Sequence, residues 1–219
     1  MRALVIGSSG GIGGALVTAL SSQGDVIGLS RRGDGFDITD EANIARHLGA
    51  LDGSFDLILV ATGALYLEGV GPEKSLKALD PAVLAGQFAV NAIGPALVIK
   101  HALRLMPRDR VARLGVLSAR VGSIGDNALG GWYGYRAAKA ALNQLVHTAA
   151  IEAARTHPQS VLVALHPGTV ETGLSPADRA GHPSVAPAVA AGNLLAVLGG
   201  LGPADTGGFF DWQGKVVPW

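Results

Sequence analysis

Short, unbroken runs of apolar residues recur along the chain and alternate with longer segments whose apolar positions repeat at helical spacing. The first run, residues 3–6, leads through a glycine-rich turn into a helical pattern over residues 12–20. Unbroken apolar strands are typical of a parallel sheet covered on both faces, and their alternation with helices is typical of α/β domains. Further strands are expected at residues 26–30, 55–60, 113–118 and 161–165, with a terminal strand or hairpin at 209–217.

Proline positions help to set the expected helices, which lie from residue 40 onwards and over residues 81–106, 136–155 and 188–198. Pro81 suits the first turn of its helix, Pro95 predicts a bend partway along it, and Pro158 follows the end of the next. The expected fold is a single Rossmann-type domain, a doubly wound α/β parallel sheet. Residues 32–36 are too few for a covering helix, so we expect that edge of the sheet to be more exposed.

Composition disfavours several classes of function. The 219 residues fit one domain, and 17 basic residues balance 17 acidic ones, so no net charge attracts nucleic acid or an anionic membrane. The absence of cysteine removes disulfides, thiolate nucleophiles and cysteine-bound metals, and is compatible with a reducing cytoplasm. Because 48% of residues are hydrophobic and only 16% are charged, we expect a partner subunit to cover part of the surface, in a homodimer or homotetramer. The helices at 81–106 and 136–155 would pack against their copies in the partner; the alternative is that their apolar faces only cover the sheet.

Three stretches without charge, residues 3–24, 81–99 and 184–204, raise the question of a membrane span. Several glycines interrupt the first, Gln87 and Asn91 lie in the second, and Pro187 and Asn193 lie in the third. These features suit buried helices of a globular protein better than a bilayer. We therefore expect no membrane segment and a cytoplasmic location.

The turn after the first strand has the sequence Gly-Ser-Ser-Gly-Gly-Ile-Gly at residues 7–13. Such a turn at a helix N-terminus lets backbone N–H groups hold a pyrophosphate, although an ordinary βα turn is the alternative. No Gly-Lys-Ser/Thr follows, so a nucleoside-triphosphate loop is not indicated. We expect dinucleotide binding, with contacts from Gly7, Ser9, Gly11, Ile12 and Gly13.

The second predicted strand ends in Ser30-Arg31-Arg32, where dinucleotide-binding folds recognise the adenosine ribose. An acidic side chain there binds the 2′-hydroxyl of NAD, whereas arginine accommodates the 2′-phosphate of NADP. No acid occurs before Asp34, so NADP(H) is favoured and NAD(H) stays possible; a solvated turn is the alternative for both arginines. Asp37, which precedes Ile38, either reaches the adenine edge or caps the helix that begins near Asp40.

Tyr135 and Lys139 are four residues apart on a predicted helix and therefore project from one face. A neighbouring ammonium stabilises phenolate and lowers the pKa of a tyrosine, which fits it for proton transfer. The polar, glycine-rich residues 118–134 lead into this helix from a strand end, where open α/β sheets bind ligands. His147, His157 and His166 lack the spacing of metal ligands, and no metal is expected.

These motifs, in this order, resemble those of the short-chain dehydrogenase/reductase family over essentially the whole chain, in particular its compact C-factor-like and carbonyl-reductase-type members. Gly7-x-x-x-Gly11-x-Gly13 resembles the cofactor loop of the family, and Tyr135-x-x-x-Lys139 resembles its catalytic pair. Ala61-Thr62-Gly63 resembles the Asn-Ala-Gly turn of the family, and Asn91 resembles the asparagine of its catalytic tetrad. Residues 208–215 resemble its last strand. The segment that closes over the nicotinamide in the family is matched by Pro167, Gly168, Val170 and Thr172.

The resemblance implies hydride transfer between NADP(H) and a small carbonyl or alcohol substrate. It implies Tyr135 as general acid/base, with Lys139 lowering its pKa and bonding the nicotinamide ribose. It also implies Ser118 as the residue that holds the substrate oxygen and Asn91 as the anchor of a proton-relay water. Asn91, Tyr135 and Lys139 thus count as cofactor contacts as well, and residues 172–187 as a substrate lid.

Several alternatives stay open. Ser123 competes with Ser118, because Ser118 is followed by Ala-Arg-Val-Gly rather than the usual Ser-x-x-Gly. Asn91 has a structural alternative, which is to satisfy the backbone carbonyl that Pro95 leaves unpaired. Trp132 is a candidate lining residue of the substrate pocket, and Trp212 and Trp219 are expected in the core or a subunit contact. The rival functions are a cofactor-binding signalling or regulatory protein with little turnover, and an alcohol dehydrogenase that uses NAD.

Overall fold

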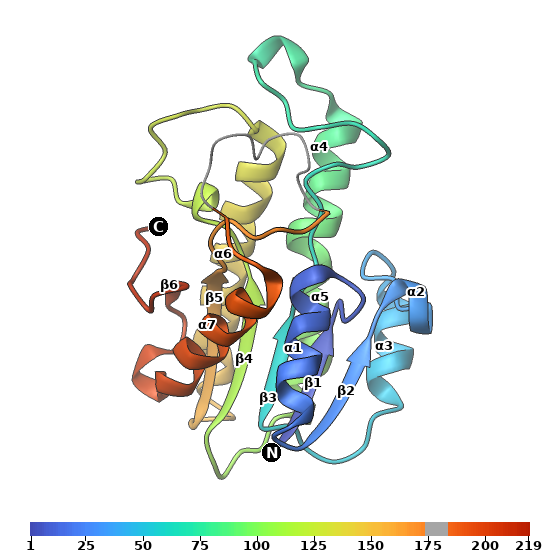
Figure 1. Ribbon diagram of the computed structural model, residues 1–219, viewed down its shortest axis with the longest axis vertical. Coiled ribbons are helices and arrows are strands. Elements are labelled where there is room, and N and C mark those ends of the chain that lie inside the picture. Colours follow the sequence, from blue (N-terminus) through green and yellow to red (C-terminus); the bar gives the residue numbers. More distant parts are fainter. Residues whose placement is uncertain (174–183) are drawn as a thin grey trace.

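The computed structural model describes residues 1–173 and 184–219, and within them a six-stranded sheet forms the centre of the molecule (Figure 1). Every neighbouring pair of its strands is parallel. The order across the sheet is β2-β1-β3-β4-β5-β6, so the winding direction reverses between β1 and β3, where open α/β sheets bind ligands. The strands are β1 (Arg2–Ile6), β2 (Asp25–Leu29), β3 (Leu57–Val60), β4 (Ala112–Leu117), β5 (Ser160–His166) and β6 (Phe209–Asp211).

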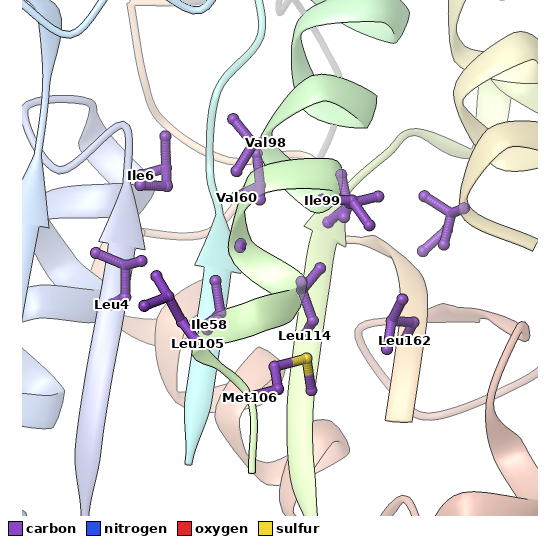
Figure 2. Packing of buried hydrophobic residues seen from close by; sticks show 14 of the residues in the cluster. Leu4, Ile6, Ile58, Val60, Val98, Ile99, Leu105, Met106, Leu114 and Leu162 are labelled. Atoms are coloured by element: carbon purple, nitrogen blue, oxygen red, sulfur yellow. The ribbon is translucent and has the colours of Figure 1, made fainter. Parts of the chain in front are cut away.

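Helices cover both faces of the sheet, which confirms the doubly wound Rossmann-type fold. On one face, α1 (Gly11–Ser21) packs against α7 (Pro187–Gly200). On the other lie α3 (Glu41–Gly49), α5 (Gly94–Ala102) and α6 (Tyr133–Ala153). Strand residues alternate between the two cores, because successive side chains of a strand point to opposite faces. Figure 2 shows the second core, in which Leu4, Ile6, Ile58, Val60, Leu114 and Leu162 from the strands meet Val98, Ile99, Leu105 and Met106.

The predicted helix 81–106 is one helical run with a change of winding inside it. It consists of α4 (Pro81–Phe88), a π-helical turn (Ala89–Ile93), α5 and a 3₁₀ turn (Leu103–Leu105). The π-turn lies just before Pro95, in the part of a helix that a proline disturbs, because the proline ring meets the carbonyl four residues earlier. The run is long and apolar enough to cross a membrane, with a mean hydropathy of 1.8, but core helices of globular proteins share that composition and this one packs on α6.

The edge of the sheet at β2 is open, as the short segment after it predicts. Asp25 is exposed and the next three residues are half-buried, whereas residues 3–6 of the neighbouring β1 are fully buried. After β2 the chain makes a single helical turn, α2 (Arg31–Asp34), and the extended residues 36–38 form no strand. α3 then begins at an Asp40 cap, whose carboxylate accepts from the N–H groups of Ala42 and Asn43.

The helix that carries Tyr135 begins three residues earlier than predicted, at Tyr133. The predicted terminal hairpin is confirmed, because β6 is followed by a turn and an antiparallel bridge between Phe210 and Val216. Trp219 stacks on Phe209 and meets the ring of His147 edge to face, while 47% of its surface stays exposed.

Candidate active site

The backbone of the turn between β1 and α1 is open to close approach by a bound group, because its glycines carry no side chains. Gly7 has a left-handed φ of +90°, and its N–H donates to the carbonyl of Leu29 at 2.8 Å. A Cβ on Gly13 would lie 2.1 Å from the carbonyl oxygen of Gly7, so a side chain does not fit there. The N-cap of α1 is Gly10, with no side chain bonded to the first N–H groups of the helix. This uncapped N-terminus fits a pyrophosphate.

The segment after β5 lies against this turn. A Cβ on Gly11 would lie 2.7 Å from Cγ2 of Thr172, so the two motifs meet although 161 positions separate them. Gly168 has a φ of +78° and faces the indole of Trp212, and Val170 forms a parallel bridge with Val185. Most of the expected lid, residues 174–183, lies outside the described residues.

An acidic group does lie at the end of β2, contrary to the reading of the sequence alone. The single turn α2 folds Asp34 back, so that its carboxylate accepts from the N–H of Ser30 at 2.8 Å and from the Ser30 hydroxyl at 3.2 Å. Arg31 and Arg32 are exposed in the same turn. The ribose end of the expected site therefore holds two exposed arginine side chains and a carboxylate that is already hydrogen-bonded to the protein.

Asp37 is not a helix cap, because Asp40 fills that role. Its carboxylate accepts from the N–H and the hydroxyl of Thr39, and these bonds hold the pKa of Asp37 below its usual value. The next residue, Ile38, faces α5, since a Cβ on Gly94 would lie 2.5 Å from its carbonyl oxygen. Asp37 and Ile38 thus line the junction between α2 and α3.

Tyr135 and Lys139 lie one turn apart on α6, and both are buried, with 6% and 2% of their surface exposed. The Lys139 ammonium is 5.8 Å from the centre of the Tyr135 ring and donates to the carbonyl of Leu117, the last residue of β4, at 2.9 Å. Gly122 lets this contact form, because a Cβ on it would lie 2.8 Å from the Lys139 backbone carbonyl carbon. Helix and strand end are therefore closely packed at the lysine.

Burial shifts the pKa of both groups in opposite directions. It raises the pKa of Tyr135 to about 12, because the phenolate loses its hydration, and it lowers the pKa of Lys139 to about 7, because the ammonium loses its own. The expected lowering of the tyrosine pKa by the lysine is therefore not found in the ligand-free chain. At neutral pH Tyr135 carries its proton.

Asn91 lies in the π-turn and is fully buried. Its side-chain N–H₂ donates to the carbonyl of Ala64 at 2.8 Å and to Oε1 of Gln87 at 2.7 Å, and its Oδ1 accepts from the Ala64 N–H at 3.0 Å. These partners rule out the alternative in which the side chain satisfies a carbonyl freed by Pro95. A Cβ on Gly63 would lie 3.2 Å from Oδ1 of Asn91 and 3.5 Å from Nζ of Lys139, so the two residues converge there.

The two candidate serines have different hydrogen bonds. The Ser118 hydroxyl donates to Oδ1 of Asn143 on α6 at 2.6 Å, two helical turns below Tyr135. The Ser123 Oγ accepts from the N–H of Asp126 at 3.1 Å, which leaves its hydroxyl proton free to donate. Asn143 was not predicted, and its buried Nδ2 has no partner among the described residues.

The neighbouring turn after β3 differs from the family pattern at Thr62, whose hydroxyl is buried without a partner within the described residues, while the N–H of Ala61 donates to the carbonyl of Ile6. His166 ends β5 beside Pro167, and burial, with Arg120 nearby, lowers its pKa to about 4. In residues 1–173 and 184–219, no group of three or more His, Cys, Asp or Glu side chains is arranged to hold a metal ion.

Two surface hollows, of about 410 and 340 Å³, lie beside the C-terminal segment. The first is lined by α7, Leu201 and residues 212–214, and the second by His147, residues 204–210, Val216, Val217 and Trp219. Neither includes Asn91, Tyr135 or Lys139. The candidate active site is therefore defined by side chains that converge from separate elements.

The chain is similar to several known proteins in sequence and in structure. A family model described as enoyl-(acyl carrier protein) reductase matches residues 34–199. The C-signal protein of Myxococcus xanthus is 37% identical over 143 residues, 64% of this chain and 81% of the relative. The 1-hydroxy-2-glutathionyl-2-methyl-3-butene dehydrogenase of Rhodococcus sp. (strain AD45) is 29% identical, over 99% of this chain and 98% of the relative.

A solved structure from Burkholderia multivorans, assigned to the short-chain dehydrogenases/reductases and containing bound NADP, superimposes with a TM-score of 0.83 at 26% identity. The superposition covers 100% of this chain and 99% of the other. The sheet order and the glycine turn define a Rossmann-type oxidoreductase fold. With the family model matched over most of its length, the chain belongs to the short-chain dehydrogenase/reductase family.

Proposed function

We propose that this protein is an NADP(H)-dependent reductase or dehydrogenase that acts on a small carbonyl/alcohol pair. The observation that carries the proposal is the convergence of Tyr135, Lys139 and Asn91 at one end of the sheet, next to the uncapped glycine turn. A bound nicotinamide supplies or accepts the hydride. The residues of the chain then have to hold the substrate oxygen and move one proton.

Tyr135 is the proton donor in the reducing direction. Its raised pKa keeps the phenol protonated at neutral pH, and its helix fixes the ring beside Lys139. Lys139 would bond the nicotinamide ribose of a bound cofactor, and Asn91 holds the turn after β3 in place through its bonds to Ala64. Either Ser118 or Ser123 donates a hydrogen bond to the substrate oxygen.

The end of β2 supports NADP(H) as the cofactor. Arg31 and Arg32 are exposed beside the expected ribose, and the carboxylate of Asp34 is engaged by two hydrogen bonds from Ser30, so that it is not free to accept from the 2′-hydroxyl of NAD. The similar protein from Burkholderia multivorans contains bound NADP. Comparison of NADPH with NADH by calorimetry separates this proposal from an NAD-dependent alcohol dehydrogenase.

The test is the Tyr135→Phe variant, assayed by oxidation of NADPH with a small panel of ketones, aldehydes and quinones. We expect kcat to fall by about 100-fold or more, because removal of a general acid typically costs that much. Cofactor binding by calorimetry should stay unchanged, because the phenyl ring keeps its packing.

Tyr133→Phe is the matched control, since it removes the same atom from the same helical turn without the lysine partner. Its kcat should equal that of the native chain. Native turnover in the Tyr135→Phe variant would contradict the proposed role of Tyr135, and failure to bind either nucleotide would contradict the function as a whole.

The similarity to the C-signal protein favours one second candidate, a signalling or regulatory protein that binds the cofactor but turns over little. The two functions differ in what Tyr135→Phe does. A signal carried by the cofactor-bound fold survives this change, whereas a reductase loses its activity. A chain that binds NADPH tightly, yet oxidises it with no member of the substrate panel, would favour the signalling function.

A further inference from the structure

The helix that carries Tyr135 begins without a cap from its own neighbourhood. Its N-cap residue is Trp132, and no side chain next to it in sequence bonds the first N–H groups of α6. Trp132 also has a left-handed backbone, with φ of 54° and ψ of 41°, which is costly for a bulky residue. Such a conformation persists only where contacts from elsewhere hold it.

Glu73, from the segment between β3 and α4, makes those contacts. Its backbone carbonyl accepts from the N–H of Trp132, and its side-chain Oε2 accepts from the N–H of Gly134 at 3.0 Å. These are the N–H groups of the N-cap and of the second helical residue, which no helix can satisfy internally. Glu73, 61 positions away from Gly134, thus acts as a cap delivered from another part of the chain.

The fit around the carboxylate is tight. Glu73 is only 5% exposed, and a Cβ on Gly134 would lie 2.8 Å from its Oε1, so a side chain at this position would displace the carboxylate. Oε1 itself has no hydrogen-bond partner among the described residues. Burial of a half-satisfied carboxylate is costly, and the positive end of the helix dipole is what offsets the cost.

This contact lies directly beside the proposed chemistry. Gly134 precedes Tyr135, and its Cα also faces Gln87, which hydrogen-bonds Asn91. Trp132, whose N–H Glu73 holds, meets the Tyr135 ring edge to face at 6.3 Å between ring centres. Glu73 therefore bonds both Trp132 and Gly134, the two residues whose placement sets the orientation of the Tyr135 ring.

We propose that Glu73 is a positioning residue for the reaction: its cap on α6 holds Trp132 in the left-handed conformation and thereby fixes the Tyr135 hydroxyl against the substrate. The proposal rests on the proposed function. The rest of α6 does not depend on this cap, because buried residues along its 21 positions anchor it to the sheet. Loss of Glu73 loosens only the first turn, and with it Tyr135.

The test compares Glu73→Ala, Glu73→Gln and Gly134→Ala with the control Glu68→Gln, an exposed glutamate of the same segment. Glu73→Ala should lower kcat by about tenfold or more, because small misplacements of a reacting group cost that much, while Kd for NADPH and KM for the carbonyl substrate stay unchanged. Glu73→Gln keeps an acceptor for Gly134 and should restore most of kcat. Gly134→Ala should reproduce the loss by pushing the carboxylate away.

Amide hydrogen exchange, read in the same variants, separates this proposal from the proposed function. Exchange at residues 132–136 should rise in Glu73→Ala and stay native in the later turns of α6. Unchanged exchange there would overturn the cap whatever the activity is. Faster exchange in Glu73→Ala together with a native kcat would overturn the positioning role, and so would weaker binding of NADPH together with a native kcat. If the native chain itself shows no turnover, that result counts against the proposed function alone.

Discussion

Lys139 is enclosed by its own protein, and its ammonium donates to the carbonyl of Leu117 in a site that is 2% exposed. Burial lowers its pKa to about 7 from its usual value of 10.5. The fold therefore bears a cost for keeping this ammonium away from water. The same burial raises the pKa of the neighbouring Tyr135 and keeps its phenol protonated, which suits the proton donor that we propose.

Lys139→Met should therefore stabilise the ligand-free protein at neutral pH. Between pH 7 and 10.5 the unfolded chain holds a proton on this lysine that the folded chain has lost, so native stability rises with pH in that window. The cost is greatest below pH 7, with an upper limit of about 5 kcal/mol from the size of the shift. Urea unfolding of both proteins at several pH values should show a gap in free energy of unfolding that closes toward pH 10.5.

A gap that is independent of pH would contradict this explanation, because it would trace the stabilisation to packing of the methionine side chain. Lys100→Met is the matched control, since that lysine is exposed and pairs with Glu41 at the surface. Its free energy of unfolding should follow the native value at every pH, apart from the small effect of a surface ion pair.

The serines give a second prediction about single side chains. Because the Ser118 hydroxyl proton is already directed at Asn143, whereas that of Ser123 is free, we expect Ser123→Ala to lower kcat more than Ser118→Ala. Loss of one donor to the reacting oxygen typically costs about 100-fold. Steady-state assays of both variants decide the matter: a larger loss in Ser118→Ala would give the role to Ser118, which must then release Asn143 when substrate binds.

The π-turn before α5 and the helix α6, which pack against each other, present large apolar side chains to solvent. Ile93 in the π-turn is 51% exposed, and Leu145 and Ile151 on α6 are 39% and 53% exposed. Exposed apolar groups on neighbouring helical segments are typical of a subunit contact, and they support the homodimer or homotetramer expected from the sequence.

Light scattering at micromolar concentration should give a mass of two or four chains. Ile151→Glu should lower that mass, because a buried, unpaired carboxylate is costly in an interface. Val189→Glu places the same charge at a 51% exposed position on α7, outside the proposed contact. It is the control, and it would lower the mass only if the subunits met through α7 instead. A native chain that already has the mass of one chain would contradict the assembly.

The elements were largely predictable from sequence, because their signals are local. The apolar runs gave the strands, Pro81 gave the start of α4, and the predicted start of α7 lies one residue after the observed one. The π-helical winding before Pro95 and the early start of α6 were not predicted. Asn91, in the π-turn, bonds Ala64 of the turn after β3, and Trp132 is held by Glu73, so both segments make contacts that a local pattern does not contain.

In the molecule as a whole, the candidate site combines residues from widely separated parts of the chain. The spacing of Tyr135 and Lys139, together with the family resemblance at Asn91, was enough to name these three residues, and the structure brings them together. Glu73 and Asn143 have no motif of their own, and Asp34 reaches the end of β2 only because α2 is a single turn. What sequence could not supply was therefore the network of hydrogen bonds behind the reacting groups.

The placement of the tryptophans gives the protein an optical reporter of its own site. Of the three in the chain, Trp132 touches the ring of Tyr135, and Trp212 faces Gly168 in the segment expected to close over the nicotinamide. Trp219 packs away from them, against Phe209 and His147. Emission quenched by a nucleotide, or by a substrate, can thus be assigned to one side of the site by replacing a single indole, and occupancy can be followed without any attached dye.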